Sequence, residues 1–159
     1  MNTRRTHIIF ASIAILFMLL VASFVIFHDR TQSRSFKRVD RSAEMVQTYY
    51  FEDDIVLRQV VVSRQSYSVL RVSNKEQAER YFLPLNTLFN AIKGVDDKME
   101  FYDTYLIHTR TLDLTVMCGK ELRELQQAEG VTISGDSDTK ITMSESEEQL
   151  LASGYQEIK

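Results

Sequence analysis

Histidine is the side chain best suited to acid–base chemistry near neutral pH, and the chain has three of them. His7 and His28 stand at the two ends of an uncharged apolar run, while His108 lies between Leu106 and Arg110 in a predicted strand. A general base needs a second group to orient it, and none is close to His108 in sequence. We therefore interpret His108 as an ordinary, partly exposed ring rather than a general base or a metal ligand.

Cys118 is the only cysteine, so no intramolecular disulfide is possible. Its thiol would be a nucleophile, as in a hydrolase, if it met His108 and an acidic side chain in one cleft. However, Cys118 shares one side of a predicted helix with Leu122 and Leu125, which favours buried apolar packing. We predict no catalytic residue, no bound cofactor and no metal ligand, and hence no enzyme.

Clustered carboxylates are the remaining candidates for binding chemistry. Asp136 and Asp138 follow Gly135 in the manner of a calcium loop, but the glycine is misplaced and no glutamate closes the loop. The acidic segments 52–54 and 96–97 would suit a cation or a basic partner. We predict turn and solubility roles for all of these carboxylates.

Aromatic side chains are dense around the predicted sheet, and a sheet face carrying them would form a binding surface. Core packing is the use that we favour for them. The residues concerned are Tyr49, Tyr50, Phe51, Tyr67, Phe101, Tyr102 and Tyr105.

The run from Ile8 to Phe27 contains twenty residues and no charge. As a helix it would be about 30 Å long, which matches the hydrocarbon core of a bilayer. Arg4 and Arg5 precede it, as in a secretory signal. Ser23 stands where a lipid-bearing cysteine would complete a lipobox, and the apolar run continues beyond it. We predict an uncleaved transmembrane helix within residues 1–28, whose partner is the lipid bilayer.

The segment 29–44 is rich in charged and polar residues and is predicted to be a basic linker. The positive-inside rule alone would place the chain after this segment in the cytoplasm. The short leader, which resembles a signal peptide, favours the opposite orientation. We predict a single-pass membrane protein whose domain, residues 45–159, is extracytoplasmic.

Charge and length limit what this domain does. From Thr48 onward the chain has twelve basic and nineteen acidic residues, so nucleic acid is excluded as a partner. The length suits one small domain with a single core.

Hydrophobic periodicity predicts the elements of the domain. The chain predicts antiparallel strand pairs, each followed by a helix that starts at a capping residue and ends at a glycine. We expect an α+β fold of order ββα-ββα-α, with an antiparallel sheet of about four strands and helices packed on one face. The expected strands are 45–51, 55–63, 97–102 and 105–116, with a short extended piece at 131–133. The expected helices start at the capping box of residues 73–76, span 119–127, and run from the capping box of residues 144–147 to residue 153.

The first expected helix has one apolar stripe and a proline. Ala78, Tyr81, Phe82, Leu85, Leu88, Phe89 and Ile92 share that stripe. Pro84 lies off it and is expected to kink or divide the helix, and Gly94 is expected to end it.

Four segments together resemble the YehR-like family of small bacterial lipoproteins, a domain of unknown function. They are YYFEDDIVLRQ from Tyr49, VSNKEQAERYFLPLNTLFNAIKGV from Val72, GVTISGD from Gly130 and SEEQLLASGYQEI from Ser146. The resemblance implies an extracytoplasmic domain tethered to a membrane, in a Gram-positive bacterium. The chain departs from the family at Ser23, and the resemblance implies no functional residues.

Two functions remain open. The first is a non-enzymatic envelope module that binds a small ligand, a wall component or another envelope protein through a sheet face or a groove. The second is an accessory subunit of a multi-spanning transporter or sensor, acting through its transmembrane helix. Small residues that would suit such a helix interface are Ala11, Ser12, Ala14, Ala22 and Ser23.

Overall fold

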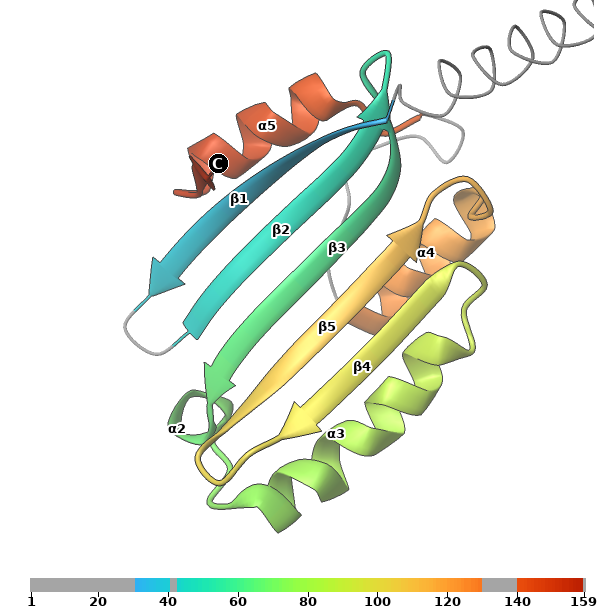
Figure 1. Ribbon diagram of the computed structural model, residues 1–159. Coiled ribbons are helices and arrows are strands. Elements are labelled where there is room, and N and C mark those ends of the chain that lie inside the picture. The colour runs from blue at the N-terminus through green and yellow to red at the C-terminus, as the bar shows by residue number, and fades with distance from the viewer. Residues whose placement is uncertain (1–30, 41–42, 130–139, 159) are drawn as a thin grey trace, which may run out of the picture. The chain divides into compact units, whose positions relative to one another are not determined.

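The computed structural model describes residues 31–40, 43–129 and 140–158. Chain contacts separate residues 1–32 from residues 33–159, and the fold below is that of the second unit. Its sheet has the strand order β4-β5-β3-β2-β1-β6 (Figure 1). The strands are β1 (Gln32–Asp40), β2 (Ala43–Glu52), β3 (Ile55–Ser66), β4 (Val95–Phe101), β5 (Tyr105–Asp113) and β6 (Gln156–Ile158).

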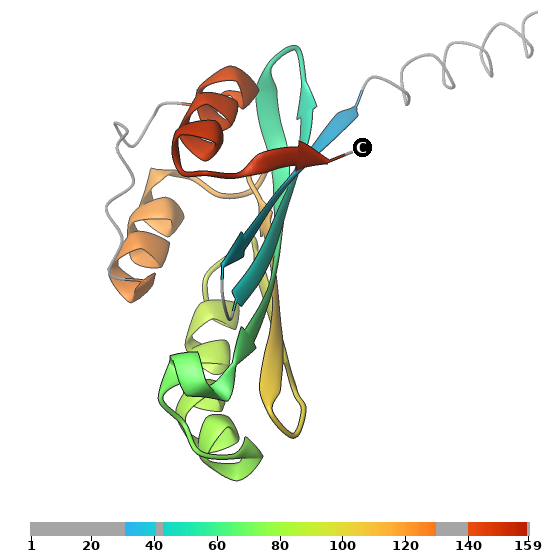
Figure 2. The ribbon, with the colours of Figure 1, turned by 90° about the vertical axis from the view of Figure 1, so that its left-hand side faces the viewer.

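The helices of the described residues lie on one face of the sheet (Figure 2). They are α2 (Tyr67–Leu70), α3 (Lys75–Asn90), α4 (Gly119–Glu129) and α5 (Met143–Ala152). The pairs β2–β3, β3–β5, β4–β5 and β1–β6 are all antiparallel. The α+β class, the antiparallel pairing and the one-sided helices therefore agree with expectation.

The predicted number of strands is wrong, because the sheet has six strands rather than about four. Segment 29–44, expected to be a linker, contains β1. Phe36 in this strand is completely buried, while Lys37 is neutralised by Glu44 at 2.6 Å. A charged sequence thus forms a strand because its charges find partners on neighbouring elements.

The predicted transmembrane helix, Ile8 to Phe27, lies outside the residues that the structure describes. Within the described ranges, no helix is long and apolar enough to cross a membrane. The expected architecture, a spanning helix followed by a four-stranded domain, is therefore corrected to a six-stranded antiparallel sheet with helices on one face.

Helix α3 begins one residue later than its sequence signal suggested. Asn74 is the N-cap, and its Oδ1 accepts a hydrogen bond from the Gln77 N–H at 2.9 Å. The helix continues through Pro84 as one element. Ala78 and Phe89 are buried, but the expected apolar stripe is only partly covered. Three members of that stripe are exposed: Tyr81, Leu85 and Leu88.

The core consists of three apolar clusters beneath the helices. The first joins β1, β2 and α5 around Phe36, Tyr49 and Leu150. The second joins α3, α4 and β5 around Phe89 and Leu125. The third joins α2, α3 and β5 and contains Tyr67, Val72, Ala78 and Leu106.

Candidate functional site

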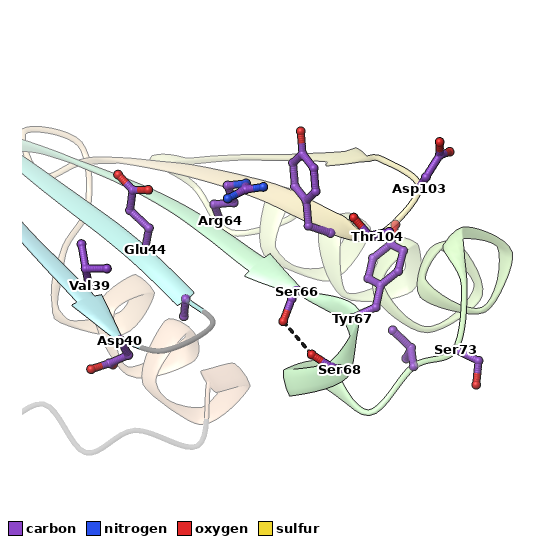
Figure 3. A pocket seen from close by; sticks show the side chains of 13 residues that line it. Val39, Asp40, Glu44, Arg64, Ser66, Tyr67, Ser68, Ser73, Asp103 and Thr104 are labelled. Atoms are coloured by element: carbon purple, nitrogen blue, oxygen red, sulfur yellow. Dashed lines mark hydrogen bonds between the residues drawn. The ribbon is translucent and has the colours of Figure 1, made fainter.

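A cavity of about 700 Å³ lies where the β1–β2 ends, the end of β3, helix α2 and the β4–β5 turn meet (Figure 3). Its wall combines apolar surface with hydroxyl and carboxylate side chains around two tyrosine rings. Polar side chains that line it are those of Asp40, Glu44, Arg64, Ser66, Ser68 and Asp103.

Helix α2 forms a fixed wall of the cavity because Tyr67 is bonded at both ends. Its backbone N–H donates to Thr104 O at 3.0 Å, and its hydroxyl donates to Tyr102 O at 2.6 Å. The chain then turns through Arg71, whose φ of 56° lies in the left-handed region. Burial, with the charges of Glu79 and Asp103, raises the pKa of Tyr67, so this hydroxyl stays protonated.

Charged and aromatic groups line the rim of the cavity. Glu44 accepts a hydrogen bond from Lys37, and this contact lowers the pKa of Glu44. The Arg64 guanidinium lies 4.1 Å from the ring centre of Tyr105, which stacks on Tyr102 with ring centres 4.7 Å apart. Such stacking holds Arg64 at the rim with its N–H donors available.

The lining offers hydroxyl, carboxylate and guanidinium groups. Ser66 and Ser68 are hydrogen-bonded to each other at 2.9 Å. Neither histidine nor cysteine is among the described residues that line the cavity, and its acidic groups are the carboxylates of Asp40, Glu44 and Asp103. Hydroxyls, carboxylates and one guanidinium can together form many hydrogen bonds to a polar ligand.

His108 and Asp97 form a second polar cluster, beneath the β4–β5 pair. His108 Nε2 lies 2.6 Å from Asp97 Oδ1, and Arg110 Nε donates to the same oxygen at 2.7 Å. Asn86 Nδ2 donates to Asp97 Oδ2 at 3.0 Å. Asp97 is therefore buried and fully bonded, and the expectation that segment 96–97 is a solvated acidic turn is wrong for this residue.

Arg110 also stacks on Phe89, with its guanidinium carbon 3.8 Å from the ring centre. The expected description of His108 as partly exposed is correct, since 20% of its side chain is exposed. Its partner was missed because the contact depends on the register of β4 against β5. The cluster joins α3 to the sheet, and we assign it a structural role.

Cys118 is exposed, so the prediction of buried apolar packing is wrong. It precedes α4, and both its backbone N–H and its thiol bond Glu121 Oε2. These hydrogen bonds lower the pKa of Glu121 to about 2. Cys118 also borders a second cavity of about 460 Å³, beside Leu122. Cys118 thus bonds Glu121, whereas His108 bonds Asp97, so the two side chains do not share an acidic partner.

The other candidates have varied positions. His7, His28, Asp136 and Asp138 lie outside the described residues. Asp53 and Asp54 form the β2–β3 turn with positive φ, as expected for segment 52–54. Asp54 Oδ1 also accepts hydrogen bonds from the N–H and the hydroxyl of Ser144, which docks this turn on α5. Among the described residues, no three histidine, cysteine or carboxylate side chains are grouped to hold a metal.

The aromatic residues divide between the core and the sheet surface. Tyr49 and Tyr67 are buried, as core packing predicts. Tyr102 is 38% exposed, and Tyr50 lies beneath Arg58. The residues that line the cavity beside α2 could not be recognised in the sequence because they come from five elements. Locally, the neighbouring hydroxyls of the SYS segment, residues 66–68, are the signal that marks it.

The antiparallel sheet, with its helices on one face, defines a small α+β domain, and the cavity lies at one end of that sheet. The family model described as "Protein of unknown function (DUF1307)" matches residues 32–156, so the chain belongs to this family. The match confirms the resemblance to YehR-like lipoproteins.

The relatives are similar along most of their length. An uncharacterised lipoprotein from Escherichia coli strain K12, YehR, is 29% identical over 150 residues, covering 91% of this chain and 96% of its own. The uncharacterised lipoprotein Lmo0207 from Listeria monocytogenes is 27% identical, with 91% and 94% covered. Neither these names nor the family description states an enzymatic activity.

Two solved structures are similar to the fold. The solution structure of Escherichia coli YehR has a TM-score of 0.70 and 28% identity, and the match covers 82% of this chain and 93% of that one. A protein from Streptococcus pneumoniae TIGR4 has a TM-score of 0.56 at 14% identity, with 80% and 85% covered, which shows the fold alone.

Proposed function

We propose that this protein is a non-enzymatic binding module of the bacterial cell envelope, which faces outside and takes a polar wall component or small ligand into the cavity beside α2. The observation that carries the proposal is the 700 Å³ cavity itself, with its hydroxyl and carboxylate lining and without an activated nucleophile among the described residues. The lipoprotein names of the relatives support a position at the envelope.

The form of the cavity favours a hydrogen-bonding ligand. Ser66, Ser68 and Asp103 offer oxygen atoms, and Arg64 offers N–H donors at the rim. Tyr67 is rigidly held, so the wall is formed before a ligand arrives, which lowers the entropic cost of binding. Wall polymers carry many hydroxyl and amide groups of the kind that such a lining can bond.

The test is co-sedimentation of the purified full-length protein with bacterial cell-wall sacculi. Ser68→Trp places an indole in the cavity, and we expect it to weaken binding about tenfold, equivalent to about 1.4 kcal/mol. Ser153→Trp is the matched control, because Ser153 is exposed after α5 and is not part of the lining. Equal binding by Ser68→Trp and the wild type, or no binding by the wild type, would contradict the proposal.

A further inference from the structure

We infer that the outer edge of β4, from Met99 to Phe101, is a docking site for an extended amphipathic peptide segment of another protein. The segment would pair with β4 and extend the sheet by one strand. This interaction surface is separate from the cavity, since none of its residues lines that cavity.

The backbone of β4 presents hydrogen-bonding groups to the outside. Asp113 N–H donates to Gly94 O at 2.7 Å, and Tyr102 N–H donates to Tyr105 O at 2.9 Å. These bonds lie at the two ends of the antiparallel β4–β5 pair, where bonded positions alternate with unbonded ones. Even-numbered residues of β4 therefore bond β5, and odd-numbered residues direct their N–H and C=O groups away from the sheet.

Helix α3 and the turn that follows it satisfy these outward groups in the first half of the strand. Val95 N–H donates to Ile92 O at 3.1 Å. Asp97 N–H donates to Asn90 Oδ1 at 2.8 Å, and Asp97 O accepts hydrogen bonds from Asn86 and Asn90 at 2.6 and 2.8 Å. The amide side chains thus close the edge at Asp97, and α3 runs beside β4 in Figure 1.

The second half of the strand is open. Among the hydrogen bonds of the described residues, none involves the outward backbone groups of Met99 or Phe101. Unpaired edge groups of this kind are the template for strand addition. The site is short, so a partner strand gains four backbone hydrogen bonds. Contacts of its side chains must supply the remaining binding free energy.

The flanking side chains indicate an amphipathic partner. On one face of the sheet, Lys98 and Glu100 are exposed and would oppose charges on the added strand. On the other face lies α3, where Leu83 shares a helix side with Asn86 and Asn90 by its spacing. Leu83 is 48% exposed, and an added strand with apolar side chains facing α3 would cover it.

A second copy of this chain is a poor occupant. If β4 paired with itself about Met99, Phe101 of one copy would face Asp97 of the other, whose backbone groups are already bonded. If it paired about Glu100, two glutamates would lie opposite each other, which is unfavourable. The β4 edge is therefore better suited to a strand of another protein than to β4 of a second copy of this chain.

The experiment uses the full-length protein and an eight-residue synthetic peptide that alternates valine with charged residues, placing glutamate opposite Lys98 and lysine opposite Glu100. Met99→Pro removes an outward N–H without removing a β5 bond, a substitution that edge strands tolerate. We expect at least about tenfold weaker peptide binding, whereas the control Met99→Ala, which keeps the N–H, binds like the wild type. Ser68→Trp is expected to leave this affinity unchanged, which separates the inference from the cavity function.

A measurement on the unaltered protein guards against misfolding of the proline variant. Backbone amides of Met99 and Phe101 should exchange rapidly in the free protein and become protected when the peptide is added. Amides of Lys98 and Glu100 should be protected in both states because they bond β5. Unchanged exchange at Met99 and Phe101, equal peptide affinity of Met99→Pro, or self-association of the free protein through β4 would overturn the inference.

Discussion

Burial and neighbouring charged groups act in opposite directions on the pKa of Asp97. Its side chain is completely buried, and burial acts to raise its pKa. Hydrogen bonds from His108 and Arg110 act in the opposite direction and prevail, so the pKa of Asp97 lies below its ordinary value. The carboxylate thus stays charged because two elements, β5 and α3, direct donors at it.

Asp97→Asn should destabilise the protein by about 3 kcal/mol at neutral pH, because Arg110 and His108 lose the carboxylate that accepts their hydrogen bonds. Urea denaturation followed by circular dichroism measures the change. Asp96→Asn is the matched control, because Asp96 is exposed and its loss should cost less than about 0.5 kcal/mol. Equal stability of the two variants would show that the cluster contributes nothing.

The difference in stability between the wild type and Asp97→Asn also has a defined pH dependence. Because the pKa of Asp97 is lowered by folding from an ordinary value of 3.8, its contribution is complete above that pH. The contribution is lost as the pH falls through the lower pKa of the folded state. The stability gap between the wild type and Asp97→Asn should therefore stay constant from pH 7 to pH 5 and narrow only below about pH 4. Narrowing between pH 7 and pH 5 would assign the effect to another group.

At the scale of elements, the sequence predicts those helices and strands whose ends are determined by neighbouring residues in the chain. The helix that starts after Asn74, the strand after the Asp53–Asp54 turn and the last helix were all found in the sequence from caps, turns and periodicity. Strand β1 was missed because Arg34 bonds partners more than a hundred residues away, Glu147 and Glu157. The buried side of α3 was misjudged because polar Asn86 and Asn90 face β4.

Gly94 and Gly154 have similar positive φ angles but different surroundings. Comparing alanine substitutions at the two positions therefore distinguishes the cost of backbone strain from the cost of a steric clash. Gly94 joins α3 to β4 with φ of 86°, and a Cβ there would lie within 3.0 Å of Asp113 O and closer to Met117. Gly154 follows α5 with φ of 82°, and a Cβ there would meet nothing within 4 Å. Gly154→Ala should cost about 1 kcal/mol from backbone strain alone, and Gly94→Ala about 3 kcal/mol. Thermal denaturation compares them, and equal losses would refute a packing role for Gly94.

At the scale of the whole molecule, the cavity is the feature that could not be predicted from the sequence. Its wall combines Asp40 from β1, Arg64 from β3, Ser68 from α2 and Asp103 from the β4–β5 turn. None of these residues is unusual where it stands in the chain. They meet only because the strand order brings these segments to one end of the sheet.

Arg34 joins segments from the two ends of the described chain. Its guanidinium bonds both carboxylate oxygens of Glu147 in α5 and both of Glu157 in β6. Arg34→Lys keeps the charge but cannot form two planar pairs, so we expect a loss of about 1 kcal/mol and faster amide exchange in β6. Arg80→Lys, in an exposed pair within α3, should change stability by less than about 0.3 kcal/mol. Unchanged β6 exchange in Arg34→Lys would argue against this role.

The pairing of β1 with β6 also affects when the domain can form. Strand β1 precedes its partner β6 by more than a hundred residues, so the register of Phe36 against Glu157 is reached only after β6 has been made. The strand order thus delays closure of this part of the sheet relative to the β2–β3 hairpin, whose strands are adjacent in the chain.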